Sequence, residues 1–294
     1  MSQNEPYRPP QSGQYIPPPA GYGATSDIPP QSPYHHSPTP QQGNRSALGW
    51  LASAGLAVWA VVKYGLVVLV KIPAFATLLS ALVSFGAYSL FYGPWFAVAL
   101  VAMIFVHEMG HVVEIRRQGM AATAPIFIPF LGAAIFQRQH PTTAVKQAQI
   151  GIAGPIAGTL GATVAFVLYG STQNPVFLIA ATIGFFLNLI NMLPVWQLDG
   201  AWVLAPVSPW FQVLGLAAIA ALVLVFHFVS ALLIIIALLG IGSARAAFRN
   251  ANNPYYTSVP ASARLALGAA WLGLVLYLGV MTLQAESLFT ALAR

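Results

Sequence analysis

The sequence predicts an all-α polytopic membrane protein with about seven transmembrane helices, for three reasons. Hydrophobic residues make up 57% of the 294 residues and charged residues only 6%, whereas soluble domains carry about 25% charged residues. Most apolar runs have the ~20 residues that a spanning helix needs. The runs are apolar on every face, unlike the alternating strands of a β-barrel. They lie at 48–71, 72–92, 94–115, 147–170, 175–196, 208–226, 228–244 and 264–284.

Composition divides the chain into four parts. Residues 1–45 hold 11 of the 23 prolines and many glutamines, so we predict a disordered tail whose binding partner, if it has one, is unknown. The stretch 46–71 is interrupted by Lys63 and is predicted to be an interfacial or re-entrant helix. The membrane-embedded core is expected over 72–245, and a C-terminal transmembrane helix and tail over 246–294.

Basic residues predict the orientation of the chain. They stand in connections between apolar runs, and the positive-inside rule assigns that side to the cytoplasm. The net charge of +6 therefore reflects topology, and no nucleic acid partner is expected. We expect an integral protein of a bacterial inner membrane. The basic residues that carry this prediction are Arg116, Arg117, Arg138, Lys146, Arg245, Arg249 and Arg264.

The segment 118–146 differs from the apolar runs around it. Pro125, Pro129 and Gly132 interrupt a series of Ile and Phe residues, which argues against a straight spanning helix. We predict a re-entrant or extended hairpin on the cytoplasmic side.

The motif His107-Glu108-Met109-Gly110-His111 places ionisable side chains inside an apolar run. Such a group costs ~2.5–3.5 kcal/mol in a membrane helix unless it is paired or ligated. Residues i and i+4 share one face of an α-helix, so His107 and His111 can bind one metal ion with Glu108 beside it. The alternative, two histidines hydrogen-bonded to neighbouring helices, would bury three polar groups without that compensation.

A catalytic zinc site needs a third protein ligand, and the chain has no cysteine. Asp199 is the natural candidate, because it follows an apolar run that ends on the same side as His111. Standing alone, an Asp-Gly pair would be read as a helix-terminating turn. His140 and His227 are also available as ligands, but their positions in connections favour a structural or interfacial role for each. Glu114 shares the histidine face and could either support the site or pair with a neighbouring arginine.

Three motifs together resemble the site-2 protease family of intramembrane zinc metalloproteases. They are the HEMGH helix, the sequence Gly151-Ile152-Ala153-Gly154-Pro155, and the stretch from Asn191 to Gly200, NMLPVWQLDG. The resemblance implies a three-helix catalytic core in which His107, His111 and Asp199 hold a single zinc ion. It also implies that Glu108 is the catalytic base, that Asn191 lines the site, and that a transmembrane protein substrate is cut within or near the bilayer. The positive-inside rule adds that the active site faces the cytoplasmic side.

Two other functions stay open at this point. A metal transporter would need polar residues along several spans, and this chain has one acidic cluster. A non-proteolytic scaffold with structural zinc would not need Glu108. For a protease, the apolar segment 125–137 is our candidate to pair with an unwound substrate strand. The glycines at positions 154, 158 and 161 are expected to permit close helix packing.

Overall fold

The computed structural model describes residues 53, 55–60, 63–64, 72–136, 139–224 and 231–292. Residues 1–61 form a unit separate from 62–294. The predicted disordered tail over 1–45 lies outside the described residues. Most of the predicted helix over 46–71 also lies outside them, although residues 55–60 and 63–64 are helical.

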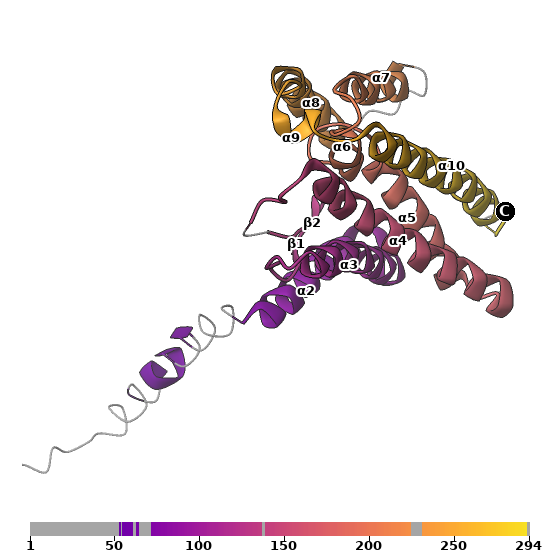
Figure 1. Cartoon of the computed structure of the whole chain (residues 1–294). Coiled ribbons are helices and arrows are strands. Elements are labelled where there is room, and N and C mark those ends of the chain that lie inside the picture. The colour runs from indigo at the N-terminus through magenta and orange to yellow at the C-terminus, as the bar shows by residue number, and fades with distance from the viewer. Residues whose placement is uncertain are drawn as a thin grey trace, which may run out of the picture. The chain divides into compact units, whose positions relative to one another are not determined.

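The second unit is built almost entirely of helices, with one short hairpin (Figure 1). This confirms the all-α polytopic membrane fold. The elements are α2 (Pro73–Tyr92), α3 (Pro94–Arg117), β1 (Ile126–Ile128), β2 (Gly132–Ala134), α4 (Ala144–Thr172), α5 (Pro175–Asn191), α6 (Asp199–Leu204), α7 (Trp210–Leu224), α8 (Ala231–Arg249), α9 (Pro254–Thr257) and α10 (Ala261–Leu292).

Proline and capping residues set the helix boundaries. Proline is the first residue of α2, α3 and α5, where the missing N–H would have no partner in any case. Gly93 separates α2 from α3 with φ of 86°, a conformation that favours glycine. Asn174 caps α5 by accepting a hydrogen bond from the Val176 N–H at 3.0 Å.

Four helices of the described residues are long and apolar enough to cross a membrane: α2, α3, α4 and α10. The helices α5 and α7 are apolar but shorter, so the count of about seven spans stays a prediction. The helix expected over 175–196 ends at Asn191, before Pro194, and the short helix α6 was not predicted. Proline disfavours the α conformation in the residue that precedes it, which explains why α5 ends before Pro194.

The helices α3, α4 and α5 pack against one another, in agreement with the predicted three-helix core. The helix α10 runs alongside α5 and covers the side of the core that α5 and α4 form (Figure 1). Phe185, Leu178 and Leu278 are fully buried where these helices meet. Among the described residues, these closely packed helices form a well-buried core.

The segment after α3 forms an antiparallel hairpin, which confirms the prediction of an extended hairpin. Phe127 of β1 lies opposite Ala133 of β2. Three hydroxyl groups of α2 form hydrogen bonds with the hairpin segment on the side of β1. The Thr77 hydroxyl donates to the Pro125 carbonyl at 2.7 Å. Ser80 Oγ accepts from the Phe127 N–H at 3.1 Å, and the Tyr88 hydroxyl accepts from the Phe130 N–H at 2.9 Å.

Candidate metal centre

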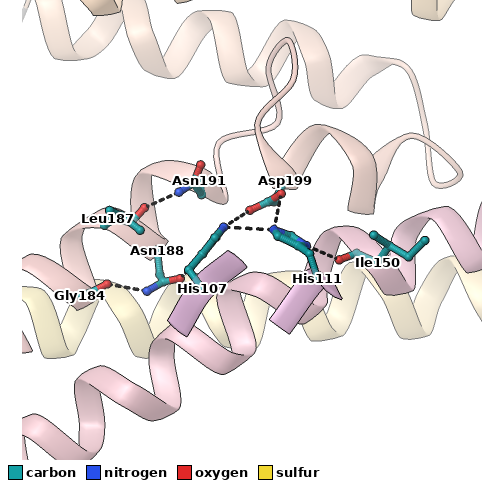
Figure 2. Close-up of polar contacts among 8 residues, drawn as sticks. All are labelled: His107, His111, Ile150, Gly184, Leu187, Asn188, Asn191 and Asp199. Carbon is teal, nitrogen blue, oxygen red and sulfur yellow. Dashed lines mark hydrogen bonds and ion pairs between the residues drawn. The ribbon is translucent and has the colours of Figure 1, made fainter. Parts of the chain in front are cut away.

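Three potential metal ligands converge from two helices. His107 and His111 stand one turn apart on α3, and Asp199 is the first residue of α6. One ligand atom from each residue lies within 4.8 Å of the others. Figure 2 shows both imidazole rings pointing toward the Asp199 carboxylate. The structure thus brings together the three residues that the sequence predicted as ligands.

Hydrogen bonds on the far side of each ring assign the histidine tautomers. His107 Nδ1 lies 2.8 Å from Asn188 Oδ1, and His111 Nδ1 lies 2.8 Å from the Ile150 carbonyl (Figure 2). Asn188 Nδ2 donates to the Gly184 carbonyl at 2.6 Å, which orients the amide oxygen toward the ring. Both oxygens can only accept, so each Nδ1 carries the hydrogen. When the ring is neutral, each imidazole therefore presents a bare Nε2 to the centre.

The resulting arrangement is suited to a metal cation. The two Nε2 atoms are 3.1 Å apart, and they lie 3.1 and 3.3 Å from the two carboxylate oxygens of Asp199. Asp199 Oδ2 is buried and has no hydrogen-bond donor among the described residues. Lone pairs packed this closely repel unless a cation lies between them. Tetrahedral zinc with bonds of ~2.0–2.1 Å requires ligand separations of about 3.3 Å, so these residues fit zinc.

A short ordered loop presents Asp199. The Trp271 indole N–H of α10 donates to the Met192 carbonyl at 2.8 Å, which fixes the start of the loop. A side chain at Gly200 would overlap that same part of the main chain.

Asn188 is a supporting residue that the sequence analysis missed. Its side chain is fully buried, and it sets the tautomer of His107, as outer hydrogen-bond partners of metal ligands commonly do. A methyl group at Gly158 of α4 would overlap its amide, and one at Gly154 would overlap the His111 ring. These two glycines therefore make room for site residues, in addition to the predicted close packing. A polar residue inside an apolar run was the available signal.

Glu108 and Asn191 line the same cavity as the three ligands. The cavity has a volume of about 510 Å³ and reaches the hairpin at Ala133 and Phe136. The Glu108 side chain is nearly buried, and the hydrogen bonds and ion pairs found among the described residues do not include its carboxylate. Asn191 Nδ2 donates to the Leu187 carbonyl at 3.1 Å, which leaves its second amide hydrogen for another acceptor.

The other candidate ligands are not part of this cluster. His140 is exposed, and His227 lies outside the described residues. Glu114 accepts two hydrogen bonds from Arg117, at 2.6 and 2.7 Å, so it takes the ion-pair alternative. The described residues thus leave Asp199 as the third member of the group.

The family model of Peptidase family M50 matches residues 95–175. The matched segment holds α3, the hairpin and α4, and so includes His107, Glu108 and His111. No curated protein matches the chain. The segment that carries the HEMGH helix is thus identified as Peptidase family M50, the site-2 protease family of intramembrane metalloproteases.

Proposed function

We propose that the protein is an intramembrane zinc endopeptidase that hydrolyses peptide bonds of transmembrane proteins within or near the bilayer. One observation carries the proposal: two bare imidazole nitrogens and a carboxylate converge in a cavity that Glu108 also lines. A structural zinc site has four protein ligands, whereas a catalytic site keeps a position open. Three protein ligands beside an unpaired carboxylate favour the catalytic kind.

The chain's own residues have distinct roles in this proposal. His107, His111 and Asp199 would hold a zinc ion, which would supply Lewis-acid polarisation of the scissile carbonyl and activation of water. The Glu108 carboxylate takes a proton from the attacking water and delivers it to the leaving amide nitrogen. Asn191 directs its second amide hydrogen toward the substrate carbonyl oxygen, as the family resemblance implies.

The matching experiment compares the wild-type chain with Asp199→Ala, produced at equal levels in the membrane. We expect about one zinc per purified wild-type chain and little in the variant, because two imidazoles alone bind zinc poorly. Quantitative proteomics of the same membranes should show shortened single-span proteins with the wild type only. Full zinc retention in Asp199→Ala would contradict the ligand assignment, and equal fragment patterns would contradict the peptidase.

The hairpin supports a proposal for how the substrate is held. The Phe127 N–H points to α2, away from β2, so Phe127 and Ala133 form a non-hydrogen-bonded pair. Antiparallel geometry then directs the N–H and the carbonyl of Ala133 to the free edge of β2. The cavity of the metal centre is lined by Ala133 and Ala134. We infer that an unwound substrate strand adds to β2, because β1 is already covered by α2.

Replacing Ala133 by Pro should therefore lower cleavage of an identified substrate by about tenfold, since proline removes the edge N–H. Zinc content and thermal stability should change little. Ala133→Ser keeps the N–H and serves as the control. Ala134→Pro is expected to disturb the hairpin itself, because the Ala134 N–H faces β1. Equal cleavage by Ala133→Pro and Ala133→Ser would move substrate positioning to Asn191 and the 188–198 stretch.

The basic residues support a proposal for which side of the membrane the metal centre faces. Arg117 and Lys146 flank the end of α3 and the start of α4, and the positive-inside rule places these ends in the cytoplasm. His111 lies near the same end of α3. We propose that the metal centre opens toward the cytoplasmic side of a bacterial inner membrane.

A further inference from the structure

A second concave surface lies away from the metal centre, between α7 and α8. It is a groove with a volume of about 680 Å³. Its walls are apolar except at one end, where two guanidinium groups stand. The lining residues are Val213, Leu216, Ile241, Gly242, Ala244, Arg245, Phe248 and Arg249.

The two arginines of the groove have no counter-ion among the described residues. Arg245 and Arg249 are exposed and four residues apart, so they share one face of α8. Like charges at this spacing destabilise a helix. None of the described acidic residues lines the groove, and Glu114 and Asp199 have their own partners. The positive-inside rule explains basic residues at this end of α8 but not their position at the mouth of an apolar groove.

Two further features suit a lipid at this place. Trp210 stacks edge-to-face on Phe248 at the arginine end, with ring centroids 5.1 Å apart. Aromatic side chains of this kind are enriched at the boundary between hydrocarbon and headgroups. Gly242 lies in the groove and is exposed, and a Cβ there would meet nothing within 4 Å. The missing side chain leaves space along the helix surface.

We propose that this groove binds one anionic glycerophospholipid. Its phosphate lies between the guanidinium groups of Arg245 and Arg249, which can donate paired hydrogen bonds to phosphate oxygens. One acyl chain follows the apolar wall over Gly242 and Leu216. The combination of a basic mouth and an apolar groove between helices selects an anionic lipid over a zwitterionic one. This site is independent of the proposed peptidase activity.

The test uses the full chain in neutral detergent with equal amounts of phosphatidylglycerol and phosphatidylcholine that carry the same acyl chains. Native mass spectrometry counts the lipid that each variant retains. The wild type should retain one phosphatidylglycerol in preference to phosphatidylcholine. Arg245→Gln with Arg249→Gln should lower the phosphatidylglycerol affinity by about thirtyfold. The double variant loses two basic groups, and each of them contributes a similar factor of about five to the affinity for an anionic lipid. Gly242→Leu should lower retention of both lipids by filling the groove.

Matched variants separate this site from general effects. Arg116→Gln with Lys146→Gln removes the same charge from two exposed positions elsewhere. Gly273→Leu adds the same side chain to α10, where a Cβ also meets nothing within 4 Å. Both controls should keep the lipid. Loss of the preference in the charge control, or its survival in the Arg245 and Arg249 double variant, would overturn the proposal. Retention unaffected by Gly242→Leu would overturn it too, since a phosphate group alone would then explain the binding.

Discussion

Replacing Glu108 by Gln is expected to lower the rate of peptide-bond cleavage by at least about 100-fold while the bound metal stays in place. Gln has nearly the size of Glu but cannot take a proton from water. The substitution leaves His107, His111 and Asp199 untouched. Cleavage of a substrate found by the proteomic comparison gives the rate, and metal analysis of the same sample gives the zinc content.

The same change at Glu114 is the matched control. Glu114 stands on α3 as well, but its carboxylate binds Arg117 and Gln118 and does not line the cavity of the metal centre. Glu114→Gln should therefore cleave at close to the wild-type rate. Unchanged cleavage in Glu108→Gln would refute Glu108 as the base, and loss of zinc from it would mean that Glu108 also supports the metal.

Gly154→Ala is expected to weaken metal binding by about 10- to 100-fold in a protein that still folds. The added methyl group would overlap the His111 ring, so the ring must turn away from the centre. Alanine favours helix more than glycine does, so α4 itself should persist. Competition with a metal chelator measures the affinity, and circular dichroism checks the helix content.

Gly170→Ala is the control for this substitution. Gly170 lies on the same helix, and a Cβ there meets nothing within 4 Å. The control should bind metal like the wild type and be slightly more stable, by about 0.5–1 kcal/mol. If Gly154→Ala bound metal as tightly as Gly170→Ala, the His111 ring could not occupy its present place in the metal-loaded protein.

Local patterns predicted the helices well and the connections only in part. The prolines at 73, 94 and 175 stand where helices begin, and Pro125 with Gly132 marked the hairpin. The helix α6 was missed because six residues give too short a pattern to separate from a loop. Its position depends instead on α10, which holds the preceding turn through Trp271.

The metal centre was predictable where the ligands follow a fixed spacing. His107 and His111 lie on one face of α3 as their separation requires. The environment of the rings was not predictable in this way. Asn188 reaches His107 from α5, and the Ile150 carbonyl reaches His111 from α4. Such contacts join residues that are far apart in the chain. Every residue has a backbone carbonyl, so the sequence cannot indicate which carbonyl accepts a hydrogen bond from an imidazole.

The hydrogen bonds that fix the two imidazoles also link metal uptake to folding. The ligands come from α3 and α6, and the groups that orient them come from α4 and α5. The ligand set therefore exists only after these four helices have assembled. A metal that binds the assembled state alone stabilises it by about 4 kcal/mol at a thousandfold excess over its dissociation constant. Removal of the metal would therefore destabilise the assembly of these helices. The first effects would be separation of the helices and faster degradation of the whole chain.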